Sequence, residues 1–237
     1  MSKLCAIIPT YNNATTVVSV IEGVYRYCKE IIVVTDGCTD ATEENLKHCE
    51  SPFVLVSYAK NRGKGYALTK GFEEARKRGF THAITIDADG QHFPEDIPSF
   101  VEKGELHPEA FIVGNRNLNE KNMPRGNTFA NKFSNFWFQL QTGVDLGDTQ
   151  SGFRLYPLQR LHGLRYITSR YEAELELLVY ASWRGEEILS VPVRVYYPPA
   201  EERVSHFRPF KDFMRITMLN CVLCIGAIFY KGKKAKM

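Results

Sequence analysis

The chain has 237 residues, of which 44% are apolar and 24% are charged. This length and composition predict one large globular domain and exclude a disordered protein. The formal net charge of +3 is too small to indicate nucleic acid as a partner. The six cysteines form no paired metal-binding pattern, and the first residues have no signal-peptide features, so we expect a reducing compartment.

Strands and helices alternate along the first half of the sequence. Short apolar runs bounded by turn residues predict four buried strands, at residues 4–8, 31–34, 53–58 and 82–86. Apolar residues at helical spacing predict helices over residues 14–29 and 65–78. The alternation predicts right-handed βαβ units, and therefore an α/β fold with a mostly parallel, doubly wound central sheet.

The second half is less regular. Strands are predicted at residues 111–113 and 188–197, and helices at residues 127–142, 170–183 and 211–230. The apolar part of the last helix, 216–230, is shorter than the roughly 20 residues that span a bilayer. We therefore expect one domain over residues 1–208 and a C-terminal apolar helix with a basic tail over residues 209–237.

The C-terminal segment is a candidate for membrane association. Its apolar helix is followed by four lysines between residues 231 and 236, an order that suits an anionic membrane face. The sequence thus predicts a peripheral protein on the cytoplasmic face of a membrane. A membrane-protein partner for this helix, its packing against the domain, and a solvated tail remain the alternatives.

Polar clusters follow three of the predicted strands, at Pro9-Thr10-Tyr11, Asp36 and Asp87-Ala88-Asp89. Ligands of parallel sheets bind beyond the carboxyl ends of the strands, so we expect these clusters to converge. Two carboxylates in this position suit Mg²⁺ or Mn²⁺, which share oxygen ligands with substrate phosphates. Gln91 is a further candidate ligand, whereas His92 is a ligand, a phosphate donor or a plain loop residue.

Taken together, these motifs resemble family 2 glycosyltransferases, which have the GT-A nucleotide-sugar-binding fold. The resemblance covers nearly all of residues 3–200 and rests on segments 7–12, 33–40, 61–65, 87–92, 114–116, 148–154 and 187–193. Within the family the chain is most similar to the dolichyl-phosphate and polyprenyl-phosphate mannosyl- and glucosyltransferases. An enzyme of the hexosyltransferase class is therefore expected.

The resemblance implies a role for each matching residue of the donor site. The residues implied to bind the nucleotide-sugar are Pro9, Tyr11 and Asp36 at the base and ribose, Asn61 and Lys64 along the donor, and Asp87 at the nucleotide side. The implied ligands of Mg²⁺ or Mn²⁺ are Asp89, Gln91 and Asp87.

The resemblance also implies an acceptor site rich in arginine. Arg116 and Arg125 would bind acceptor phosphate or sugar and, with Asp89, belong to the catalytic group. Further candidate phosphate contacts are Arg203, Ser205 and Arg208. Arginine matches phosphate oxygens with a fork of donors. The expected reaction is an inverting, metal-dependent transfer of a hexose from a donor of the GDP-mannose or UDP-glucose type to a polyprenyl phosphate.

Other functions remain open. A hydroxyl acceptor on a lipid or glycan would need a general base, for which Glu172 and Glu174 are candidates, unless they are solvated or capping charges at a helix start. A phosphate acceptor is already ionised near neutral pH and needs none. A non-catalytic sugar-nucleotide-binding module is less favoured because Asp87, Asp89 and Gln91 are intact. A nucleotidyltransferase would require a glycine-rich phosphate loop near the start of the sequence, and residues 9–13 do not provide one.

Overall fold

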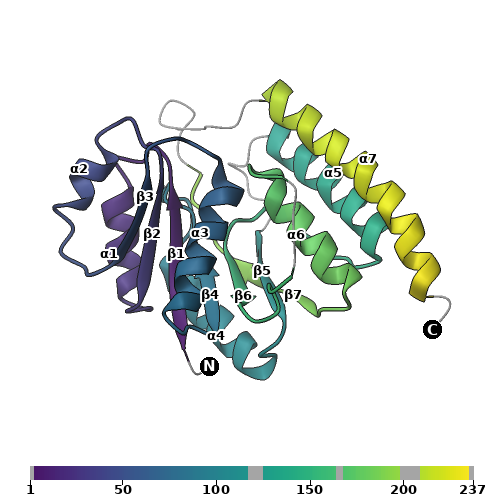
Figure 1. Ribbon diagram of the computed structural model, residues 1–237, viewed down its shortest axis with the longest axis horizontal. Helices are drawn as coiled ribbons and strands as arrows, with labels where there is room; N and C mark the ends of the chain where they lie inside the picture. The colour runs from purple at the N-terminus through teal and green to yellow at the C-terminus, as the bar shows by residue number, and fades with distance from the viewer. Residues whose placement is uncertain (1–2, 117–124, 164–167, 198–208, 235–237) are drawn as a thin grey trace.

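The computed structural model describes residues 3–116, 125–163, 168–197 and 209–234, with backbone only at 125–130, 209–213 and 230–234. One seven-stranded sheet, in the order β3-β2-β1-β4-β6-β5-β7, organises the chain (Figure 1). Its strands are β1 (Leu4–Thr10), β2 (Ile31–Asp36), β3 (Val54–Tyr58), β4 (His82–Thr85), β5 (Phe111–Arg116), β6 (Arg154–Pro157) and β7 (Ile188–Val193). The helices are α1 (Val17–Tyr25), α2 (Thr42–Leu46), α3 (Lys64–Lys77), α4 (Ile97–Leu106), α5 (Arg125–Thr142), α6 (Glu172–Trp183) and α7 (Pro209–Lys234), with a short 3-10 helix, η1 (Pro94–Asp96).

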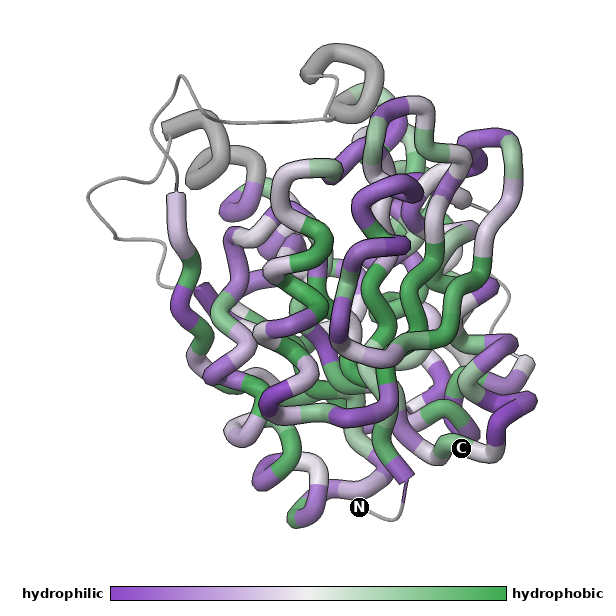
Figure 2. Tube along the Cα trace, turned by 90° about the vertical axis from the view of Figure 1, so that its left-hand side faces the viewer, coloured by the Kyte–Doolittle hydropathy of each residue, from purple (hydrophilic) through white to green (hydrophobic). Residues whose placement is uncertain are grey.

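The sheet is mostly parallel and is covered by helices on both faces. Strands β1–β4 pair in parallel, as do β5 and β7, whereas β6 is antiparallel to β4 and β5. Alternate residues of β1 enter different cores: Ile7 belongs to the core that includes residues of α3, α5, α6 and α7, and Ile8 to the core that includes residues of α1, α2 and α4. Hydrophobic residues accordingly concentrate in the central strands (Figure 2). The predicted doubly wound α/β fold is confirmed.

Helix α4 and strand β6 of the structure were not predicted. The sequence of β6, Arg-Leu-Tyr-Pro, is not a continuous apolar run. Its first residue is a buried arginine, where a buried strand would ordinarily have an apolar side chain. The predicted strand over 188–197 ends at Val193, and the predicted helix over 14–29 shortens to Val17–Tyr25.

Helix α7 packs against the body of the protein along one side. Leu219 and Leu223 belong to the same core as α3, α5 and α6, and the Gln141 amide donates to the Oδ1 of Asn220 at 3.1 Å. In the part of the chain that the structure describes, no helix combines the length and the apolar character needed to cross a membrane. The division of the chain at residue 208 stays a prediction.

Candidate active site

The candidate site lies at the carboxyl ends of β1, β2 and β4. Strands β2 and β4 pair with opposite sides of β1, so the direction of chain winding reverses between β1 and β4. Ligands of open α/β sheets bind at such a reversal. The predicted clusters at Tyr11, Asp36 and Asp87 all lie at this edge, as the sequence indicated.

Asp36 fixes the loop that leads into α3. Its carboxylate is buried and accepts hydrogen bonds from the backbone N–H groups of Arg62 and Gly63, both at 2.7 Å. Gly37, next to it, has a φ of 65°, and a Cβ atom there would overlap the backbone of Asn61. Asp36 therefore sets the positions of the predicted donor residues Asn61 and Lys64, in addition to its own predicted contact with the base.

Hydrogen bonds also join the loops that follow β1, β2 and β4. The Asn12 Oδ1 accepts from the N–H of Thr39 at 2.8 Å, and the Oδ2 of Asp40 accepts from the N–H of Ala14 at 3.2 Å. The Thr16 hydroxyl donates to the carbonyl of Ala88 at 2.6 Å. The loops after β1, β2 and β4 are thus joined directly to one another by hydrogen bonds.

Lys64 joins two carboxylates from distant parts of the chain. Its ammonium lies 2.6 Å from Oδ1 of Asp87 and 2.8 Å from Oε2 of Glu174, and its side chain is 14% exposed. Burial opposes the charge on Lys64, but the two carboxylates outweigh it and raise the pKa of Lys64. Burial likewise opposes the charge on Asp87, whereas Lys64 lowers the pKa of Asp87. Lys64 and Asp87 are therefore charged near neutral pH.

Gly152 lies against the ion pair of Lys64 and Asp87, in a place where a side chain would not fit. The Thr85 hydroxyl donates to the carbonyl of Gly152 at 2.8 Å, which holds the segment before β6 beside β4. A Cβ atom at residue 152 would overlap Oδ2 of Asp87 and would lie 2.5 Å from the ammonium of Lys64. Only glycine fits here without displacing a predicted donor residue. The sequence prediction gave Gly152 no role.

Arg154, at the start of β6, supports the same region from inside the protein. Its side chain is 1% exposed and donates to the carbonyls of Ser151 at 2.6 Å, Thr149 at 2.9 Å and Glu174 at 2.8 Å. These bonds fix the segment beside Gly152 and the first turn of α6. Sequence reasoning missed this role, although an arginine directly after Gly-Phe and before Leu-Tyr is an unusual start for a buried strand.

The residues predicted to bind Mg²⁺ or Mn²⁺ fit a divalent cation. Burial and the neighbouring charge of Asp87 raise the pKa of Asp89 to about 6, so a bound cation would relieve an unfavourable charge. The N–H of Gln91 donates to Oδ1 of Asp89 at 3.0 Å, which brings Gln91 beside that carboxylate. Within the described ranges no three His, Cys, Asp or Glu side chains form a metal-binding group. Two carboxylates, one amide oxygen and donor phosphates remain a suitable set for Mg²⁺ or Mn²⁺.

His92 is the remaining polar residue of this loop. Its side chain is 8% exposed, and its Nδ1 has no hydrogen-bond partner among the residues that the structure describes. Burial lowers the pKa of His92 to about 4, so the imidazole is neutral near pH 7. A neutral, buried ring with an unpaired nitrogen fits a metal or phosphate contact better than a plain loop residue.

Arg116 is held by an acidic partner that the sequence prediction did not assign. Its Nε and Nη2 donate to the carboxylate of Asp148 at 2.6 Å and 3.0 Å, and Asp148 is fully buried. Burial opposes the charge of each partner, but their mutual contact lowers the pKa of Asp148 and raises that of Arg116. Nη1 takes no part in this fork, so the predicted phosphate contact of Arg116 would use that nitrogen.

The two candidate bases lie in the first turn of α6, and both are buried. Glu174 is bound by Lys64, as described above. Oε1 of Glu172 lies 3.8 Å from the guanidinium of Arg215 on α7. The side chains of the other predicted acceptor residues are not among the described parts of the chain. Arg125 begins α5, but its side chain is outside the described part, as are Arg203, Ser205 and Arg208.

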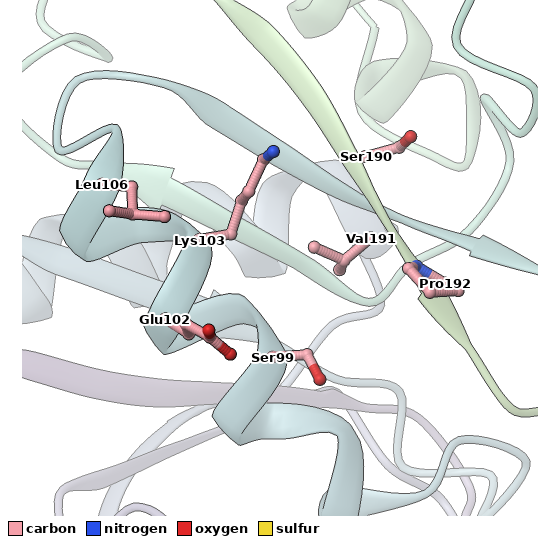
Figure 3. A pocket seen from close by; sticks show the side chains of 7 residues that line it. All are labelled: Ser99, Glu102, Lys103, Leu106, Ser190, Val191 and Pro192. Carbon is pink, nitrogen blue, oxygen red and sulfur yellow. The ribbon is translucent and has the colours of Figure 1, made fainter.

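A shallow pocket of about 290 Å³ lies elsewhere, between α4 and β7 (Figure 3). Its lining residues are Ser99, Glu102, Lys103, Leu106, Ser190, Val191 and Pro192. None of them belongs to the predicted donor, metal or acceptor sets, so the pocket is separate from the candidate site.

Fold and site together define a doubly wound α/β protein whose acidic loop suits a divalent cation. Residues 5–168 match the model of glycosyl transferase family 2. A UDP-N-acetylglucosamine–dolichyl-phosphate N-acetylglucosaminyltransferase from Methanococcus voltae is 29% identical over 90% of this chain and 94% of its own. A polyprenol monophosphomannose synthase from Mycolicibacterium smegmatis is 27% identical over 81% and 76%.

The fold comparison agrees. A glucosyl-3-phosphoglycerate synthase from Mycobacterium tuberculosis, solved with Mn²⁺, uridine diphosphate and phosphoglyceric acid, superposes with a TM-score of 0.70. The match covers 95% of this chain and 78% of that one, at 19% identity. The chain belongs to glycosyl transferase family 2 and has the GT-A fold, which confirms the resemblance found in the sequence. It is a glycosyltransferase.

Proposed function

We propose that this glycosyltransferase transfers a hexose, with inversion, from a nucleotide-diphosphate sugar to a polyprenyl phosphate at a membrane surface. The names of the two relatives, which specify dolichyl phosphate and polyprenol monophosphomannose, support the acceptor class. The proposed donor is of the GDP-mannose or UDP-glucose type. Its proposed binding residues are Pro9, Tyr11, Asp36, Asn61, Lys64 and Asp87.

The observation that supports a phosphate acceptor most is the pairing of the candidate bases with cations. Glu174 is bound by Lys64 at 2.8 Å, and Glu172 faces Arg215 at 3.8 Å. A carboxylate oxygen that is held in an ion pair is not free to take the proton of an attacking hydroxyl. A phosphate monoester supplies its own anionic oxygen near neutral pH, so it needs no proton acceptor from the protein.

A hydroxyl acceptor on a lipid or glycan is the second candidate. One observation favours it: Oε2 of Glu172 is buried and has no hydrogen-bond partner within the described part of the chain. An unpaired, buried carboxylate oxygen is able to accept a proton from an attacking hydroxyl. Glu172 is therefore the residue on which the two acceptor classes differ.

The proposed cation site consists of Asp87, Asp89 and Gln91. When bound, Mg²⁺ or Mn²⁺ would neutralise the charge that develops on the leaving diphosphate. Lys64 keeps Asp87 ionised and in place for that site. The Mn²⁺ in the superposed synthase supports a divalent cation in this fold.

We expect the arginines to matter more than Glu172. Arg125→Ala and Arg203→Ala should each lower transfer to polyprenyl phosphate roughly tenfold to a hundredfold, because a hydrogen bond to a charged group contributes about 1.5–3 kcal/mol. Glu172→Gln should retain most activity over a range of pH. Radiolabelled nucleotide-sugars and purified polyprenyl phosphate give the rates, and NMR of the product should show the inverted anomer.

Glu174→Gln is unsuitable for this test because it also disturbs Lys64. If Glu172→Gln is folded but inactive while both arginine variants work normally, the acceptor is a hydroxyl and the polyprenyl-phosphate proposal is wrong.

The outer side of α7 is proposed to bind the membrane. Its exposed apolar residues recur every three or four positions from Met214 to Ile228, on the side away from the packed Leu219 and Leu223. They are Met214, Met218, Val222, Ile225 and Ile228, with Phe229 next to the last of them. Lysines follow between residues 231 and 236. This combination is typical of helices that lie in the interface of an anionic bilayer. We propose peripheral binding on the cytoplasmic face; a membrane-protein partner for α7 is the alternative.

Changing one exposed residue of α7 to aspartate should release the protein from lipid. Ile225→Asp should weaken co-sedimentation with anionic vesicles about tenfold or more, since burying one such side chain contributes about 1.5–3 kcal/mol. Leu106→Asp is the matched control, because Leu106 is 71% exposed at the end of α4, a helix that covers the other face of the sheet. Equal vesicle binding by both variants would rule out α7 as the contact.

A further inference from the structure

The loop after the proposed cation ligands is held by a segment from the other end of the sheet. Residues 194–197 follow β7 and run beside residues 91–96. The N–H of Tyr196 donates to the carbonyl of Gln91 at 2.8 Å, and Val195 forms an antiparallel bridge with His92. The backbone at Gln91 and His92 is thus fixed by a segment about a hundred residues away in the sequence.

An ion pair between Asp96 and Arg194 also joins these two segments. The carboxylate of Asp96, which is 9% exposed, accepts from the backbone N–H of Arg194 at 2.8 Å. It also accepts from Nε and Nη2 of Arg194, at 2.9 Å and 2.8 Å. The guanidinium lies 5.2 Å from the centre of the Phe93 ring. A planar guanidinium with two bonds to one carboxylate fixes direction as well as distance.

These contacts determine where the neighbouring functional groups lie. Gln91 is a proposed cation ligand, and the unpaired Nδ1 of His92 is buried beside it. The affinity of a metal site depends on the groups that orient its ligands, because a loosely held ligand must be ordered when the ion binds.

We propose that Asp96 and Arg194 are positioning residues for the divalent-cation site. They act through the backbone of Gln91 and His92, which residues 194–196 hold in register. The inference rests on the cation site of the proposed function and is independent of the acceptor. Neither Asp96 nor Arg194 is a proposed ligand, yet cation affinity should depend on the salt bridge between them.

The test measures binding of Mn²⁺ alone, from the electron paramagnetic resonance signal of free Mn²⁺, in the full-length protein. Asp96→Asn and Arg194→Met should each weaken Mn²⁺ binding about tenfold, the lower end of what loss of an orienting group costs. The double variant should bind no more weakly than either single one, because the two residues act as a unit. In both, hydrogen exchange of the Tyr196 amide should accelerate. Arg78→Met, which removes an exposed pair with Glu74, is the control and should stay within twofold.

Mn²⁺ affinity within twofold of the wild type in both single variants would overturn the proposal, even if their melting temperatures fall. If Asp96→Asn does not fold, Arg194→Met decides, since its backbone bond to Asp96 remains. A wild-type protein that binds no Mn²⁺ also overturns the proposal. A wild type that binds Mn²⁺ but does not glycosylate polyprenyl phosphate disproves the acceptor assignment, and the affinities still decide the role of the pair.

Discussion

Lys64→Met should lower both the stability and the activity of the enzyme. The substitution leaves the buried Glu174 and the partly exposed Asp87 without their shared cation, and breaking a largely buried pair costs about 3–5 kcal/mol. For a domain of this size that corresponds to a fall in melting temperature of roughly 6–20 °C. Sugar transfer should drop by a factor of about a hundred or more, because Asp87 moves and the proposed donor contact of Lys64 is lost.

Lys70→Met is the matched control, since Lys70 lies on the same helix and forms an exposed pair with Glu73. Exposed pairs contribute only about 0–1 kcal/mol, so this variant should melt within a few degrees of the wild type. Calorimetry and transfer assays on both variants give the comparison. Similar melting temperatures for the two would show that the buried ion pair does not stabilise the fold.

Asp89→Asn should abolish transfer without destabilising the metal-free protein. In EDTA the wild type should be inactive, and activity should return with Mg²⁺ or Mn²⁺. Saturating Mn²⁺ should raise the melting temperature of the wild type but not of the variant, because an ion stabilises only a folded state that binds it. Asp145→Asn, at an exposed position, should behave like the wild type.

The pH dependence of stability gives a second measure of the same residue. In the metal-free protein the pKa of Asp89 is raised from 3.8 to about 6, so the unfolded state loses this proton first. The wild type should therefore lose stability relative to Asp89→Asn as pH rises from about 4 to 6, and keep that difference above pH 6. Denaturant unfolding in EDTA at several pH values tests this. A difference between the two proteins that does not change with pH would contradict the raised pKa.

The first half of the fold was predictable because each of its strands is a continuous apolar run that ends in a polar cluster. The positions of Tyr11, Asp36 and Asp87 at one edge followed from parallel winding alone. Strand β6 was not predictable in the same way. Its burial depends on Arg154, whose guanidinium is satisfied by the carbonyls of Ser151, Thr149 and Glu174, and no apolar pattern in the sequence indicates these contacts.

The candidate site was predictable as a set of residue types, whereas its internal contacts were not. The family resemblance gave Lys64 a role at the donor, whereas Glu174 was a candidate base because a hydroxyl acceptor would need one. In the structure the two form a single ion pair with Asp87, because α3 and α6 begin side by side. The roles of Asp148 and Gly152 likewise depend on contacts between segments that only tertiary structure brings together.

The antiparallel insertion of β6 has a consequence for the order in which a new chain acquires activity. Strands β1 to β4 are complete once about 85 residues have been synthesised, yet the Lys64–Asp87 pair gains its neighbours Gly152 and Glu174 only after some ninety more. Contacts of such large sequence separation form late, because closing a long loop costs entropy before the contact stabilises it. A nascent chain would thus expose the acidic loop before Gly152 and Glu174 surround the Lys64–Asp87 pair, and glycosyl transfer would begin only after α6 has been synthesised.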